Sequence, residues 1–139
     1  MLSFNGLFYF GVCQNKINEP NKEQLNSFRG MFVYHDGNGN KYTLNRNILE
    51  YFPIKPAQSS SGIYDGGNAF KKTLNAAQQK KLFNLFYKLV TDKPCHSTQN
   101  IKPNCSIILL EEEGNEEFII KANNKTNKLV LIFLKQLNK

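Results

Sequence analysis

Short apolar runs separated by turn residues predict two hairpins and a further strand. The β-prone runs at 30–35 and 41–44 flank Asp36-Gly37-Asn38-Gly39-Asn40, a cluster that supplies the positive φ angles of a tight turn. A third run at 47–54 contains Pro53, which ends a strand or confines it to a sheet edge. The runs at 105–111 and 117–121 predict a second hairpin, and the first of them is apolar enough for a central strand.

Two segments have helical periodicity. Asn75 followed by Gln78 forms a capping-box pattern, so a helix is expected from there to residue 90, ahead of Pro94. Residues that form one largely apolar face recur at intervals of three and four along this helix, namely Ala76, Gln79, Leu82, Phe83, Phe86, Leu89 and Val90. The run 126–137 repeats this spacing and predicts a packed C-terminal helix.

The order of these elements predicts an α+β fold, an antiparallel sheet of about five strands with two helices packed on one face. A chain of 139 residues that is 40% hydrophobic is long enough for one core. We expect three parts, namely a signal-like segment at 1–13, a polar tether at 14–29 and a single α+β domain at 30–139.

The N-terminal segment is apolar from Leu2 to Val12 and is followed by Cys13 and a polar run. Residues 8–13 resemble the end of a bacterial lipoprotein signal, in which cleavage occurs before a cysteine that carries diacylglycerol. The resemblance implies a small envelope lipoprotein whose Cys13 is attached to the membrane. The alternative is an ordered N-terminal strand in a cytoplasmic protein, because residues 7–10 are aromatic and β-prone.

The expected roles of the cysteines depend on whether Cys13 carries a lipid. The chain has 3 cysteines, so a lipid on Cys13 leaves Cys95 and Cys105 as a disulfide pair in an oxidising compartment. The alternative is a reactive Cys95 thiol beside His96, although adjacent side chains usually diverge.

The segment 55–68 is the most unusual connection, rich in Pro, Ser and Gly. It is either a solvated connection or a binding loop, since long loops in compact domains often carry recognition. The candidate binding residues are Ser59, Ser60, Ser61, Tyr64, Asp65 and Asn68.

Charge and motifs exclude several functions. The net charge of +7 comes from Lys, with only two Arg, and the shortage of guanidinium groups argues against nucleic-acid binding. Asp36, Asn38 and Asn40 match the start of a calcium loop, but Lys41 and Asn47 occupy the positions of its Gly and Glu. We identify no metal site, no cofactor and no catalytic constellation, and the acidic run 111–117 is expected to be a solvated hairpin tip.

These observations lead to two hypotheses. The first is an envelope-anchored, non-enzymatic binding or inhibitory module that meets a protein partner or surface ligand through its 59–68 loop. The second is an intracellular interaction protein, such as an immunity factor or a regulator, that uses its lysines to bind an acidic partner.

Overall fold

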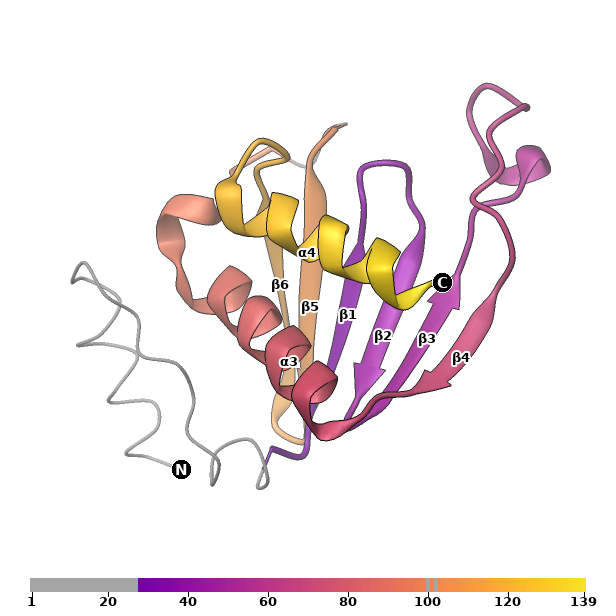
Figure 1. The fold of residues 1–139 in the computed structure, drawn as a ribbon. Coiled ribbons are helices and arrows are strands. Elements are labelled where there is room, and N and C mark those ends of the chain that lie inside the picture. The colour runs from indigo at the N-terminus through magenta and orange to yellow at the C-terminus, as the bar shows by residue number, and fades with distance from the viewer. Residues whose placement is uncertain (1–27, 100, 102) are drawn as a thin grey trace.

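The computed structural model describes residues 28–99, 101 and 103–139, which form one six-stranded antiparallel sheet in the order β4-β3-β2-β1-β5-β6 (Figure 1). The predicted α+β class is confirmed. The strands are β1 (Met31–His35), β2 (Lys41–Asn45), β3 (Ile48–Phe52), β4 (Phe70–Thr73), β5 (Cys105–Glu111) and β6 (Gly114–Ile120).

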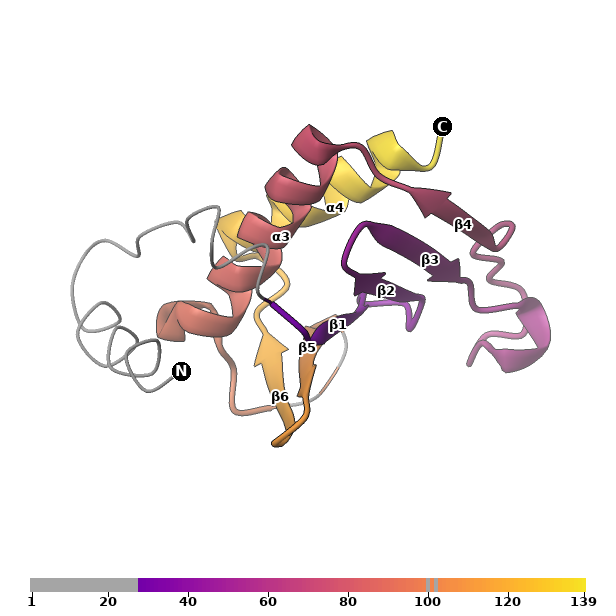
Figure 2. The same ribbon diagram turned by 90° about the horizontal axis from the view of Figure 1, so that it is seen from below.

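Helices α3 (Ala76–Thr91) and α4 (Lys125–Leu137) cover one face of this sheet (Figures 1 and 2). The capping box predicted at the start of α3 is present. The Gln78 amide donates to Asn75 Oδ1 at 2.8 Å, and the Asn75 amide donates to Gln78 Oε1 at 3.1 Å. Because two otherwise free backbone donors are satisfied, the chain enters α3 at a fixed residue.

The structure differs from the expected strands at two places. Strand β4 was not predicted, because Phe70-Lys71-Lys72-Thr73 has one apolar residue, and its strand conformation depends on pairing with β3. Strand β6 begins at Gly114, whose φ is +142°, so the hairpin turn is formed by Glu112 and Glu113. The acidic residues Glu116 and Glu117 therefore belong to the strand and not to the turn.

A row of aromatic side chains crosses four strands on the helix-covered face. Tyr34, Tyr42, Tyr51 and Phe70 are direct cross-strand partners from β1 to β4. Their successive ring centroids lie 6.2, 4.6 and 5.5 Å apart. Phe86 of α3 stacks on Tyr34 with centroids 5.7 Å apart. This aromatic row joins the core under the helices to the end of β3, where the long loop begins.

Asn127 attaches α4 to the sheet. Its side chain is fully buried, and its Oδ1 accepts a hydrogen bond from the Tyr34 hydroxyl at 2.6 Å. Its Nδ2 donates to the Ala122 carbonyl at 3.3 Å and to Cys105 Sγ at 3.5 Å. A buried amide with these partners fixes α4 in one position, because other positions would leave polar groups unsatisfied.

The segment after α3 covers part of the outer edge of β6. His96, just after the short helix η2 (Lys93–Cys95), forms a bridge with Ile120. The Ser97 amide donates to the Ile119 carbonyl at 2.7 Å, and the Lys121 amide donates to the Cys95 carbonyl at 2.9 Å. Backbone groups at the end of this edge strand are thus satisfied within the chain.

Candidate functional site

The candidate site is the connection between β3 and β4, which extends from the same end of the sheet as the β1–β2 turn (Figure 1). It contains the short helix η1 (Pro56–Gln58) and includes all of the predicted binding residues. The acidic β5–β6 turn lies at the opposite end of the sheet (Figure 1).

Asn40 of the β1–β2 turn holds the base of this loop. Its side chain is 2% exposed. Its Oδ1 accepts from the Ile54 amide at 2.8 Å, and its Nδ2 donates to Asp36 Oδ2 at 2.9 Å and to Tyr64 Oη at 2.7 Å. Asp36 Oδ1 accepts from the amides of Asn38 and Asn40 at 2.9 and 3.0 Å. The β1–β2 turn, which resembles part of a calcium loop, therefore holds the Asn40 side chain where it can bond to Ile54 and Tyr64 of the β3–β4 connection.

Gly66 is packed directly against this asparagine. Its amide donates to the Ile54 carbonyl at 2.8 Å, and its carbonyl accepts from the Tyr51 hydroxyl at 2.6 Å. A Cβ atom at residue 66 would lie 2.3 Å from Asn40 Oδ1 and 3.0 Å from Tyr51 Oη. Only glycine fits at this position without moving the loop or the groups that hold it.

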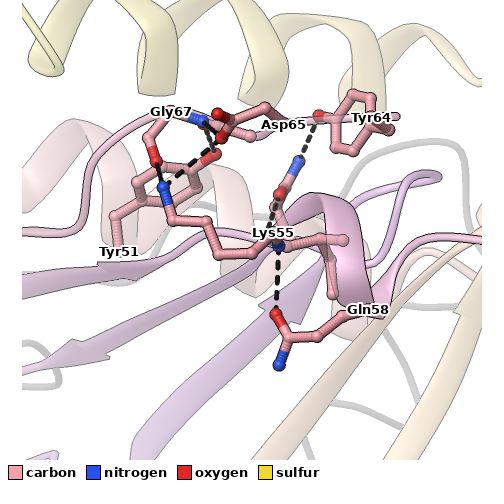
Figure 3. Close-up of polar contacts among 9 residues, drawn as sticks. Tyr51, Lys55, Gln58, Tyr64, Asp65 and Gly67 are labelled. Atoms are coloured by element: carbon pink, nitrogen blue, oxygen red, sulfur yellow. Dashed lines mark hydrogen bonds and ion pairs between the residues drawn. The ribbon is translucent and has the colours of Figure 1, made fainter. Parts of the chain in front are cut away.

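Lys55 links the start of the loop to Asp65 and Gly67 near its end (Figure 3). Its ammonium group lies 3.3 Å from Asp65 Oδ1 and donates to the Gly67 carbonyl, while the Gly67 amide donates to Asp65 Oδ1 at 2.9 Å. The hydrogen bond from Gly67 and the neighbouring Lys55 lower the pKa of the Asp65 carboxyl. Both charged side chains are about half exposed, at 48% and 55%, so this ion pair shapes the loop more than it stabilises the fold.

Serine side chains bend the tip of the loop. Ser59 Oγ accepts from the Gly62 amide at 2.9 Å, and Ser61 Oγ accepts from the Ile63 amide at 3.3 Å. Gly62 has a φ of +76° and nothing within 4 Å of where a Cβ would be. These turns present Ile63 to solvent, 82% exposed. An apolar side chain held outward on an ordered turn is suited to contact with a partner.

The predicted loop residues divide into two groups. Ser59, Ser61, Tyr64 and Asp65 make hydrogen bonds that hold the loop, whereas Ser60 and Asn68 are exposed. Sequence reasoning did not assign Asn40 to this site, because an asparagine is already expected in the tight turn at 36–40. It also missed Ile63, although one apolar residue between Gly62 and Tyr64 is the kind of signal that could have found it.

The predicted disulfide between Cys95 and Cys105 is absent, because both residues are buried free thiols. Strand β6 separates them, since Ile120 pairs with Cys105 on one side and with His96 on the other. Positions two strands apart lie about 10 Å from each other, beyond the reach of a disulfide at about 4.4–6.8 Å between Cα atoms. The predicted lipid-attachment residue Cys13 lies outside the described residues.

The alternative of a Cys95–His96 reactive pair also finds different partners. Cys95 Sγ donates to Asp92 Oδ2 at 3.3 Å, whereas His96 Nε2 lies 2.7 Å from the Leu89 carbonyl. Burial and the neighbouring Asp92 carboxylate raise the pKa of the Cys95 thiol to about 12. A thiol with this pKa is protonated near neutral pH and is a poor nucleophile.

Within 28–99, 101 and 103–139, no three side chains of His, Cys, Asp or Glu gather in a way that could hold a metal ion. In this same part of the chain, the helices are too short and too polar to cross a bilayer. Comparison with protein-family models, curated proteins and solved structures finds no match to the chain.

Proposed function

We propose that this chain is a small envelope-anchored, non-enzymatic binding or inhibitory module that contacts a protein partner through the loop from Lys55 to Asn68. The observation that carries the proposal is the contrast between the base and the tip of that loop. The base is held by the buried Asn40, while the tip exposes Ile63.

A loop that is ordered before binding loses less conformational entropy when it meets a partner. The hydrogen bonds of Asn40, Tyr51 and Lys55 supply this order here. Beside Ile63 the tip exposes the polar residues Ser60 and Ser61, and such a mixture of apolar and polar atoms is typical of protein interfaces.

Site-specific photocrosslinking in the native host tests the loop. A benzophenone side chain at residue 63 is expected to give a discrete adduct with one host protein. The same group at Asn123, an exposed residue between β6 and α4, serves as the control. Asn40→Ala should lower the yield at residue 63, because the loop loses its support. Equal adducts from residues 63 and 123 would contradict a role for the loop.

The envelope anchor requires a separate test, because it depends on the N-terminal sequence pattern that ends at Cys13. The protein from its own host should enter the detergent-rich phase of a phase-separation assay, and Cys13→Ala should move it to the aqueous phase. If both proteins enter the same phase, the anchor is wrong and the loop proposal stands on its own.

A further inference from the structure

The helix layer has an unusual charge distribution. α3 and α4 contain six lysines, Lys80, Lys81, Lys88, Lys125, Lys128 and Lys135, and no Asp or Glu. Five of the 11 acidic residues of the chain lie instead at 111–117, in and beside the β5–β6 turn. The charged residues within the two helices are therefore all basic, whereas a cluster of negative charge lies in and beside the β5–β6 turn.

Within this layer, the solvent side of α4 combines lysines with apolar side chains. Lys125, Lys128, Leu129, Ile132 and Lys135 follow a helical spacing of three and four residues, and we name them the α4 stripe. Leu129 is 47% exposed and Ile132 is 55% exposed, although both are large and apolar. The opposite side of α4 packs into the core through Val130, Phe133, Leu134 and Leu137.

We propose that the α4 stripe lies on an anionic membrane surface, with Leu129 and Ile132 in the headgroup region and the lysines facing lipid phosphates. Aliphatic residues flanked by lysines along a helix are typical of interfacial helices. A purely acidic surface would satisfy the lysines alone, whereas an anionic bilayer accommodates both the lysines and the two exposed aliphatic side chains. The inference rests on the proposed function, because that function places the domain beside a membrane.

The geometry of the chain permits this contact. α4 has 13 residues and is therefore about 20 Å long. Residues 14–27 can span at most about 50 Å when fully extended, so an anchor at Cys13 leaves α4 within reach of the bilayer. A basic surface patch adds electrostatic attraction to anionic lipids beyond that of the lipid anchor itself.

The chain contains no Trp, so a single introduced Trp reports on the stripe alone. The full chain carrying Cys13→Ala and Leu129→Trp, made without the lipid, is mixed with phosphatidylcholine vesicles containing about one third phosphatidylglycerol. Its emission should shift to the blue, and brominated lipids should quench it. Ile132→Trp repeats the measurement if the first variant does not fold. Phe52→Trp, at an exposed residue of β3 on the other face of the sheet, should not shift.

Matched charge removal tests whether the lysines of the stripe are responsible. The pair Lys128→Gln and Lys135→Gln should lower vesicle partitioning about 25-fold, because each lysine near an anionic surface contributes about five-fold. The control pair Lys41→Gln and Lys71→Gln removes the same charge from the uncovered face of the sheet and should change partitioning by less than about two-fold.

Three results would overturn the membrane contact. The first is an unchanged Trp spectrum with anionic vesicles, and the second is an equal loss from the two lysine pairs. The third is a larger blue shift with soluble polyglutamate than with vesicles, which would assign the stripe to an acidic protein partner. None of these results affects detergent partitioning of the lipidated protein or crosslinking from residue 63, so failure here is distinguishable from failure of the proposed function.

Discussion

Two buried asparagines, Asn127 and Asn40, perform the same hydrogen-bonding task in two different parts of the molecule. Asn127 is fully buried and joins α4 to Tyr34, Cys105 and the turn before the helix. Asn40 is 2% exposed and joins the β1–β2 turn to Ile54 and Tyr64 of the long loop. The first asparagine holds core elements together, whereas the second holds a surface loop in shape.

The difference teaches where polar groups stabilise the fold and where they shape a site. The partners of Asn127 are mostly inside the core, so its loss leaves groups that water cannot reach. The partners of Asn40 lie near the surface, where water can replace a lost bond. The Tyr34 hydroxyl donates to Asn127 in the core, and the Tyr51 hydroxyl donates to the Gly66 carbonyl of the loop. The aromatic row, which contains both tyrosines, therefore connects the core to the loop.

The largest effect is expected at Phe86, which packs on Tyr34 beside the Asn127 contact. Phe86→Ala should lower the free energy of unfolding by about 3–5 kcal/mol, because it leaves a cavity in a fully buried site. Leu129→Ala on the exposed side of α4 is the control and should cost less than about 1 kcal/mol. Urea unfolding measures both, and coincident midpoints for Phe86→Ala and the native protein would remove Phe86 from the core.

Asn127→Ala should cost about 1–3 kcal/mol, because the buried Tyr34 hydroxyl loses its acceptor. Tyr34→Phe in the same chain removes that hydroxyl, so the double variant should be less destabilised than the sum of the two single variants. A double-mutant cycle by urea unfolding measures this coupling. Strict additivity would show that the two side chains are energetically independent.

Asn40→Ala should cost less, about 1–2 kcal/mol, and should act mainly on the loop. Thermolysin cleavage before Ile63 should become faster than in the native protein, because the loop base is no longer held. Asn38→Ala, at an exposed residue of the same turn, should leave the cleavage rate unchanged. If both variants are cut equally fast, the order of the loop does not depend on Asn40.

Tyr51→Phe should have the smallest effect on unfolding, about 0.5–1.5 kcal/mol at neutral pH. Burial, with smaller contributions from Tyr64 and Asp36, raises the pKa of Tyr51 to about 12. Its folded-state pKa lies above the unfolded value of about 10. This contribution to stability is therefore complete below pH 10 and is lost as pH rises toward 12. Between pH 10 and pH 12 the variant should lose stability less steeply than the native protein. If the urea midpoints of the two proteins fall equally steeply over this pH range, the prediction is contradicted.

The reactivity of the cysteine thiols is expected to depend on whether the protein is folded. In denatured, unreduced Cys13→Ala protein, Cys95 and Cys105 should both be alkylated, because both are free in the structure. In the native protein at pH 8, Cys95 should react slowly, since its pKa is raised to about 12. Mass spectrometry locates the labels. A peptide pair linked through Cys95 and Cys105 would show that the disulfide forms after all.

Local signals were enough to predict most of the fold. The capping box at Asn75, the apolar face of α3 and strand β5 are encoded within a few neighbouring residues, and the structure contains all three. Strand β4 could not be predicted in this way, because its partner lies about twenty residues earlier in the chain and its own sequence is mostly polar.

The site was predicted only in outline for the same reason. The 59–68 loop is conspicuous in composition, but the residue that holds it, Asn40, lies in another turn and acts through contacts that only the folded chain brings together. The disulfide prediction was wrong because spacing along the chain gave no sign that β6 would lie between the two cysteines.

The bridge between His96 and Ile120 also affects how copies of the molecule behave together. An open strand edge is a template on which another sheet can polymerise. At β6 the segment around Ser97 already occupies part of that template, and at the other edge β4 has only four residues, two of them lysines. Covered backbone at one edge and charge repulsion at the other keep the sheets of neighbouring molecules apart, which protects the protein from fibrous aggregation at high concentration.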